Sequence, residues 1–297
     1  TTSVKVSDSA FPTTKFSKTT VNPRIAIKYE LTPSLVLRAN VGTGFRAPYG
    51  FSEDLHLCSG SPRVWKSSNL KGERAISYNL SADYYAKKYQ FSINLFRTNL
   101  KDKIQFSPAD DEVKKFGYSY QWENVDDAYV QGVELGAKAN LFRNFNAGIN
   151  WTFNQGKFKH ERADWSDPND ETVKEFPQRL QYAKDSRNVS RFPAMTGDID
   201  LDYTPGTWTF SLTSSLQGRM FIDYNSEDDG ATSKIKKTNT FMLFNCRAAK
   251  RFGSCTVYAG AKNIFSYIQD EKHTDDAAFM YAPVYGATWY VGLSVKL

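Results

Sequence analysis

FNAGINWTF at residues 145–153 alternates apolar and polar side chains at every position, and DIDLDY at residues 198–203 repeats the pattern with aspartate at each polar position. Because successive side chains of a β-strand point to opposite faces, each stretch has one apolar face and one polar face. Aspartate at every second position is incompatible with the packed interior of a small soluble barrel, but it suits a lumen filled by water or by a plug. The pattern predicts strands of a transmembrane β-barrel.

The same alternation recurs along the chain and predicts an all-β protein of about eleven antiparallel strands, with no helical pattern. The strands are expected at 22–31, 35–43, 73–86, 90–106, 119–141, 144–157, 194–203, 208–224, 239–251, 255–264 and 287–297. Short turns at 32–34, 87–89, 142–144, 205–207 and 252–254 alternate with long segments at 44–72, 107–118, 158–193, 225–238 and 265–286. This alternation places every long loop at one end, which is typical of an outer-membrane barrel with tight periplasmic turns and long extracellular loops.

The amino-acid composition further limits the classes of protein to which this chain can belong. The 297 residues carry a net charge of +6, 40% are hydrophobic, 15% are aromatic and the mean hydropathy is −0.54. This composition excludes disorder, and no apolar run approaches the ~18 residues of a transmembrane helix. Basic and acidic residues are interspersed, so a nucleic-acid partner is not expected.

Chemistry-bearing motifs are absent from the sequence. Three cysteines without CxxC spacing and three scattered histidines argue against a metal centre or a resident cofactor, and no hydrolase, metalloprotease or phosphate-loop motif indicates an enzyme. Cys246 and Cys255 flank a turn, so they either face each other across a hairpin or are two small strand residues.

The number and direction of the expected strands indicate on which side of the membrane the two ends of the chain lie. The last strand runs towards the periplasm, so counting back places the start of the first strand at the outer face. Residues 1–21 then form the end of an extracellular loop, and strands preceding Thr1 are expected to complete the barrel, because an open sheet edge cannot persist in lipid. The strand ending at Leu297 should pair with 255–264 on one side and, on its other side, with a strand that precedes Thr1.

The alternation also predicts which side chains face lipid and which face the lumen, because burying an aspartate in hydrocarbon costs on the order of 2–4 kcal/mol. The residues expected to face lipid are Ile149, Trp151, Leu201, Phe210, Leu212, Val291 and Val295. The residues expected to face the lumen are Asn150, Asp200, Asp202, Thr209, Ser211 and Ser294.

Six segments in order resemble the TonB-dependent outer-membrane receptors. They are Asn22–Ala26, Gly42–Pro48, Ser68–Glu73, Gln131–Leu135, Lys262–Phe265 and Trp289–Leu297. The resemblance implies that 22–297 is the C-terminal portion of a 22-stranded barrel, whose plug domain and N-terminal TonB-contacting segment are not in this sequence. The segment EDLH at 53–56 is similar to Bacteroidetes-type members.

The resemblance also identifies candidate site residues. Phe45, Arg46, Ala47 and Pro48 look like the family's FRAP box, and 67–73, with Asn69 and Leu70, occupies the place of its NPNL box. Ser67, Ser68 and Gly72 depart from that second box. In the haem receptors of the family a haem-ligating histidine lies between the boxes, as His56 does here, and the alternative is an ordinary loop histidine. The other candidate ligand-binding residues, for which packing is the alternative, are Tyr49, Trp65, Trp122, Tyr224, His273 and Tyr281.

The function that the resemblance implies is active import of a scarce metal chelate (haem, cobalamin or a ferric siderophore) across the outer membrane of a Gram-negative bacterium. The implied partners are TonB, which relays the energy, membrane lipid, lipopolysaccharide and a surface lipoprotein. The alternatives are a passive porin or adhesin on the same barrel, and an outer-membrane enzyme, which should show paired carboxylates or a Ser-His pair.

Overall fold

The computed structural model describes residues 18–48, 64–66, 70–108, 110–117, 120–160, 187–189, 192–221, 238–269 and 281–296. Eleven long strands form one antiparallel sheet in which each strand pairs with its sequence neighbours. The strands are β1 (Arg24–Thr32), β2 (Leu35–Arg46), β4 (Glu73–Tyr85), β5 (Tyr89–Pro108), β6 (Tyr120–Phe142), β7 (Phe145–Phe158), β8 (Met195–Tyr203), β9 (Trp208–Gln217), β10 (Phe241–Phe252), β11 (Cys255–Lys262) and β12 (Thr288–Val295). The predicted meander is confirmed.

Two short elements interrupt the long connections. β3 (Val64–Lys66) pairs in parallel with β6, and the helix α1 (Asp111–Lys114) lies between β5 and β6. The expectation of no helix is therefore wrong. The helix starts where the Asp110 carboxylate accepts a hydrogen bond from the Val113 N–H at 2.9 Å, and four residues are too few to produce a helical periodicity in the sequence. Among the described residues, no helix is long and apolar enough to cross a membrane.

β9 is shorter than expected. It ends at Gln217, whereas the alternation predicted a strand to 224. Beyond Gln217 the chain still lies beside the start of β8: the Gly218 N–H donates to the Met195 carbonyl at 2.7 Å, and the Ala194 N–H donates to the Arg219 carbonyl at 3.0 Å.

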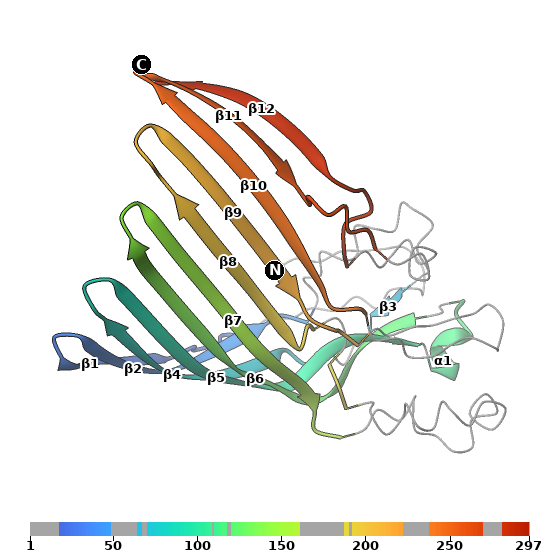
Figure 1. Ribbon diagram of the computed structural model, residues 1–297. Helices are drawn as coiled ribbons and strands as arrows, with labels where there is room; N and C mark the ends of the chain where they lie inside the picture. Colours follow the sequence, from blue (N-terminus) through green and yellow to red (C-terminus); the bar gives the residue numbers. More distant parts are fainter. Residues whose placement is uncertain are drawn as a thin grey trace.

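The tight turns all lie at one end of the sheet and the long connections at the other (Figure 1). Three of the turns contain a residue with positive φ: Asn144 at 67°, Gly206 at 63° and Gly253 at 60°. Asparagine and glycine adopt this left-handed conformation at the lowest steric cost, which is why these turns are short. The predicted sidedness is confirmed.

The strand register separates the two faces as the alternation predicted. Leu201 pairs with Ala147 and Leu212, whereas Asp200 pairs with Gly148 and Thr213, one position along and therefore on the opposite face. The polar face is linked by cross-strand hydrogen bonds, from Asn150 to Asp198 at 2.8 Å, from Ser211 to Asp202 at 2.6 Å and from Asn79 to Asn40 at 3.0 Å. The opposite face carries the large exposed apolar side chains, among them Ile149, Phe210, Val291 and Val295. That division matches a lipid face and a lumen face.

Aromatic rings gather near the tight turns on the apolar face. Phe142 stacks on Phe145 at 4.8 Å, and Trp208 stacks on Phe210 at 5.5 Å. The Lys250 ammonium lies 4.8 Å above the Trp208 ring, so its charge remains at the level of the interface. This arrangement is the aromatic girdle of an outer-membrane barrel at its periplasmic end.

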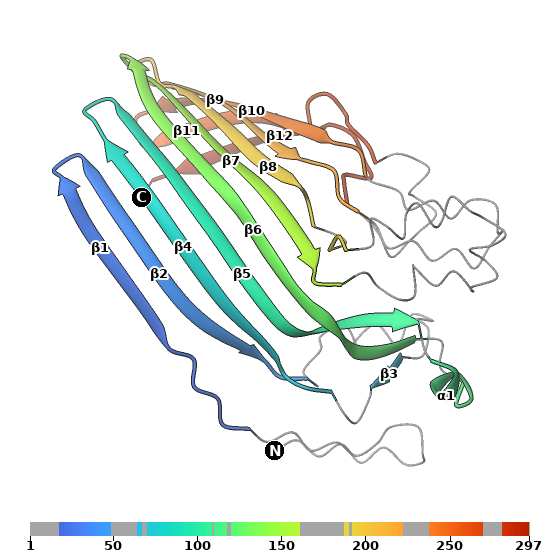
Figure 2. The same cartoon turned by 90° about the horizontal axis from the view of Figure 1, so that it is seen from below.

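The sheet is open. It curves into a trough whose two margins are β1 and β12 (Figures 1 and 2), and each of these strands pairs with one neighbour. The predicted pairing of the last strand with β11 is confirmed, whereas Leu297 lies outside the described residues.

The two described cysteines do not face each other. Cys246 pairs with Ala261 and Cys255 with Phe252, because the turn at 253–254 sets the register, and both thiols are free. They are small strand residues.

Candidate functional site

The two segments that resembled family boxes lie side by side at the end of the sheet that carries the long connections. Arg46, the last residue of β2, is the cross-strand partner of Glu73, the first residue of β4. The Arg46 guanidinium lies 4.0 Å from the Glu73 carboxylate, which also accepts the Ile104 N–H at 3.1 Å. The connection between β2 and β4 therefore leaves and re-enters the sheet at one place.

Gly72 allows this close approach. A Cβ atom added at Gly72 would overlap the Phe45 ring, which lies over the glycine backbone. The neighbouring Pro48 is almost completely buried. A proline at position 72, as in the family's second box, would need the Phe45 ring to move, so the departure from that box has a steric explanation.

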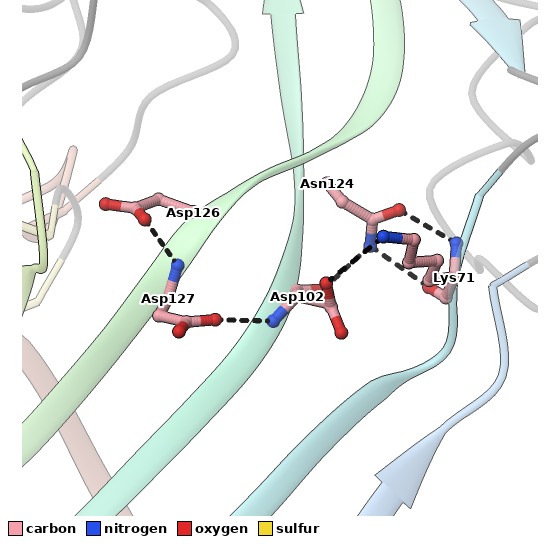
Figure 3. Close-up of polar contacts among 5 residues, drawn as sticks. All are labelled: Lys71, Asp102, Asn124, Asp126 and Asp127. Carbon is pink, nitrogen blue, oxygen red and sulfur yellow. Dashed lines mark hydrogen bonds and ion pairs between the residues drawn. The ribbon is translucent and has the colours of Figure 1, made fainter.

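The side chain of Asn124 in β6 links Lys71, just before β4, to Asp102 in β5 (Figure 3). Its side-chain carbonyl accepts the Lys71 N–H at 2.8 Å, and its amide donates to the carbonyls of Lys71 at 3.0 Å and Asp102 at 2.7 Å. The Lys71 ammonium is also 4.0 Å from the Asp102 carboxylate. One amide thus satisfies backbone groups of two separate segments.

A bulge in β5 makes the Asp102 backbone available. The β5–β6 register shifts between Leu100 and Lys103, and Asp102 has a φ of 54°. The Asp102 N–H, which no ladder partner accepts, donates to the Asp127 carboxylate at 3.1 Å (Figure 3).

The adjacent Asp126 binds the start of the next connection. Its carboxylate accepts the His160 N–H at 2.7 Å, contacts the His160 ring Nδ1 at 3.1 Å and accepts the Asp127 N–H at 2.7 Å. Asp126 lies sixteen positions before Phe142 at the periplasmic end of β6, beyond the ~9–11 residues that cross the membrane. Partial burial raises the pKa of the Asp126 carboxyl, but the hydrogen bonds from His160 and Asp127 outweigh it and hold this pKa below its usual value.

Two apolar clusters lie at the same end of the sheet. Leu70, Ile104 and Trp122 form the first, which we call the Trp122 cluster. Trp65 of β3 pairs with Gln121, the residue before Trp122. The Trp65 ring stacks on the Phe116 ring, and the two ring centres are 5.8 Å apart.

The second cluster, the Tyr281 cluster, contains Met220, Phe241 and Tyr281. The Gln269 side chain accepts the Tyr281 N–H at 2.9 Å, and Gln217 donates to the Tyr281 carbonyl at 3.2 Å. Asn263, with a φ of 51°, accepts the Tyr267 N–H at 3.0 Å and donates to the Tyr267 carbonyl at 2.8 Å. These contacts hold the residues that follow β11 against the sheet.

Comparison with known proteins gives this architecture its family. The model of the family "TonB dependent receptor-like, beta-barrel" matches residues 1–264. The chain belongs to the TonB-dependent receptors. It therefore has the outer-membrane β-barrel fold of a receptor and transporter family.

Two curated relatives show the range of this family. The vitamin B12 transporter BtuB of Photobacterium profundum is 27% identical over 231 residues, which are 76% of this chain and 30% of the relative. The ferric enterobactin receptor of Pseudomonas aeruginosa is 27% identical over 151 residues, 45% of this chain and 20% of the relative. The chain thus spans about 30% of the length of the first of these relatives.

Solved structures share the fold at low sequence identity. The copper transporter OprC superposes with a TM-score of 0.64 at 19% identity, over 92% of this chain and 39% of the other. The FrpB iron transporter of Neisseria meningitidis superposes with a TM-score of 0.65 at 14% identity, over 93% of this chain and 39% of the other. The unliganded ferric citrate transporter FecA superposes with a TM-score of 0.63 at 21% identity, over 92% of this chain and 38% of the other.

The structure places those predicted site residues of this TonB-dependent receptor that it describes at two places. Phe45–Pro48, Leu70 and Trp122 lie at the junction of the two boxes, with Trp65 beside it, whereas Tyr281 lies in the second cluster. Leu70, Trp122 and Tyr281 are buried by neighbouring side chains. The remaining candidates, His56, Tyr49, Asn69, Tyr224 and His273, lie outside the described residues. Within the described ranges, no three His, Cys, Asp or Glu side chains are placed to hold a metal ion.

Sequence reasoning missed the polar contacts that hold the junction together. Asn124 and Asp102 belong to no motif, and their partners are distant in sequence. For the residues that follow β11 there is a local signal, because Asn263 lies in Lys262–Phe265, one of the segments that resemble the family.

Proposed function

We propose that this chain is the ligand-facing barrel portion of a receptor that imports a scarce metal chelate, namely haem, a corrinoid or a ferric siderophore. The supporting comparisons are the vitamin B12 transporter and the ferric enterobactin receptor, which are homologues of this chain. Import would use energy relayed by TonB to displace a plug from the barrel, and the protein would act as a transporter and not as an enzyme.

The observation that carries this proposal is the junction at the end of β2 and the start of β4. The Arg46–Glu73 pair, the Phe45 ring on Gly72 and the Asn124 bridge fix both ends of the segment between the boxes. A binding loop whose ends are already ordered loses less conformational entropy when a ligand binds. The junction thus supports a binding role for the segment that it holds.

Within that segment, His56 is the proposed axial ligand or nearest polar contact of a metal macrocycle, because neutral imidazole donates to iron and cobalt. The proposed apolar contacts of the macrocycle are Tyr49 and Trp65, since flat rings cover macrocycle faces. The ring of Trp65 stacks with Phe116, so it is held in place before any ligand arrives.

Binding of haem, cyanocobalamin and ferric enterobactin to the intact receptor tests the proposal. If the cargo is a macrocycle, His56→Ala should weaken its binding about tenfold or more, equivalent to about 1.4 kcal/mol. The haem absorption spectrum of the variant should also change. His160→Ala is the matched control, because it removes an exposed histidine of a different connection whose ring contacts Asp126, and it should bind as the parent does.

Two results contradict parts of this proposal. Unchanged macrocycle binding by His56→Ala, or binding of the catecholate chelate alone, removes the role of His56. A steady ion conductance without ligand, with uptake unaffected by an uncoupler, contradicts active import and indicates a passive pore.

A further inference from the structure

Two of the long connections are held by neighbouring residues of β6. Asn124 binds Lys71, at the end of the connection that leads into β4, through hydrogen bonds of 2.8 and 3.0 Å. We call these bonds the Lys71 anchor. The connection that leaves β7 is held by the Asp126 carboxylate, which accepts the His160 N–H at 2.7 Å, and by the Asp127 carbonyl, which accepts the N–H of the preceding residue at 2.8 Å. We call these bonds the His160 anchor.

Asp102, at the bulge of β5, lies between the two anchors and is bound by a residue of each (Figure 3). Its carbonyl accepts the Asn124 amide at 2.7 Å, and its N–H donates to the Asp127 carboxylate at 3.1 Å. The Asp127 N–H in turn donates to the Asp126 carboxylate at 2.7 Å. A continuous series of hydrogen bonds therefore joins the two connections, through Lys71, Asn124, Asp102, Asp127, Asp126 and His160.

The backbone conformation of Asp102 depends on both anchors. Asp102 has a φ of 54°, in the left-handed region that a residue with a Cβ atom adopts at a cost. A conformation of this kind persists only where surrounding contacts hold it. The contacts here are the hydrogen bonds to the Asp102 N–H and carbonyl, and each comes from a residue of one anchor. Loss of either bond favours a return of Asp102 to an extended conformation, which turns its other backbone group away from its partner.

The Asn124 side chain passes such a change on to Lys71. Its oxygen accepts the Lys71 N–H, and its two amide hydrogens donate to the carbonyls of Lys71 and Asp102. Because the oxygen only accepts and the nitrogen only donates, one orientation of the amide makes all three bonds. Movement of the Asp102 carbonyl therefore weakens the hold of Asn124 on Lys71.

We propose that the bulge of β5 couples the two connections, so that the Lys71 anchor and the His160 anchor are released together. An element with two discrete conformations, whose equilibrium both sites bias, is the physical basis of coupling between distant sites. Coupling of this kind is reciprocal, so release of either anchor loosens the other by the same factor. The proposal goes beyond the proposed function and does not depend on the cargo.

The test is hydrogen exchange at single amides of the intact receptor in lipid nanodiscs, measured at Lys71 and His160. Asp126→Ala removes the acceptor of the His160 N–H and should also raise exchange at the distant Lys71 amide about threefold or more. Asn124→Ala should raise exchange at the His160 amide by a similar factor. In the double variant, exchange at each amide should rise by less than the product of the two single effects.

Two controls show that these effects are local. Asn140→Ala, at the periplasmic end of β6, should leave both amides as in the parent. Amides in the membrane-spanning part of β5 should exchange as in the parent in every variant. If Asp126→Ala fails to assemble, as judged by heat-modifiable migration, Asp127→Ala replaces it, because it removes the acceptor of the Asp102 N–H.

Asp102→Gly tests whether the bulge itself carries the coupling. Glycine adopts a positive φ at little cost, so the bulge should keep its conformation after one of the two hydrogen bonds is lost. Combined with Asp102→Gly, Asp126→Ala should no longer change exchange at Lys71, and Asn124→Ala should no longer change exchange at His160. Asp102→Asn is the matched control, because it retains the Cβ atom and removes only the charge that lies 4.0 Å from the Lys71 ammonium. It should preserve both distant effects.

Two results overturn the proposal. Exchange at Lys71 that is the same in Asp126→Ala as in the parent, with His160 likewise unaffected by Asn124→Ala, would show that the anchors open independently. Distant effects that remain at full size in combination with Asp102→Gly would show that the coupling does not pass through the bulge.

Discussion

At Gly132 a Cβ atom would lie 2.6 Å from the Phe96 ring and closer still to the carbonyl oxygen of Phe153. The glycine therefore allows a bulky ring on the lumen face to lie directly against the backbone of β6. It belongs to the segment Gln131–Leu135, one of those that resemble the receptor family, and the structure supplies a steric reason for glycine at this position.

Gly132→Ala should lower the free energy of unfolding by about 1–3 kcal/mol, because backbone atoms would have to move to admit the methyl group. Gly148→Ala in β7 is the matched control. Its nearest neighbour would be 3.9 Å away, an ordinary van der Waals contact. Urea unfolding of the refolded barrel should separate the two variants, and equal midpoints would show that the Phe96 ring moves aside at little cost.

At the scale of elements, side-chain amides fix the ends of the long connections. Asn124 joins Lys71, two residues before β4, to the bulge of β5, and Asn263 joins the end of β11 to the residues that follow it. Both residues satisfy backbone groups that no strand partner reaches. Loops held in this way have ordered ends even where their tips are long.

Asn124→Ala should raise the rate of hydrogen exchange at the Lys71 amide tenfold or more. The change leaves the Lys71 N–H and two carbonyls without this partner, which costs roughly 1–3 kcal/mol in local opening. Stability of the whole barrel should change little. Asn140→Ala, which removes one hydrogen bond to Asn146 at the periplasmic end, should leave Lys71 exchange as in the parent. Unaltered exchange in Asn124→Ala would show that the strands alone hold the junction.

For the whole molecule, the separation of an apolar and a polar face decides whether the sheet can sit in a membrane. Leu201→Asp should reduce the assembled fraction strongly, because a carboxylate in hydrocarbon costs about 2–4 kcal/mol. Thr209→Asp adds the same group on the lumen face of the neighbouring strand and should assemble normally. The assembled fraction of each variant is measured as the recovery of membrane-inserted, heat-modifiable protein. Normal assembly of Leu201→Asp would contradict the assignment of the lipid and lumen faces.

The eleven strands, their two faces and the end at which the long connections lie follow from the sequence alone. The reason is physical: alternation and turn residues such as Asn144, Gly206 and Gly253 act on the backbone within a few positions, so their effect is readable locally. The elements missed, β3 and α1, contain three and four residues and are too short to show a period.

The tertiary structure alone decided which distant residues meet. Asn124 reaches Lys71 across 53 positions and Asp102 across 22, and these contacts depend on the bulge that shifts the β5–β6 register. The pairing of Arg74 with Lys101 likewise follows from strand register. A shift of one residue would move every one of these side chains to the other face, and register is set by the summed pairing of whole strands, which no short stretch of sequence contains.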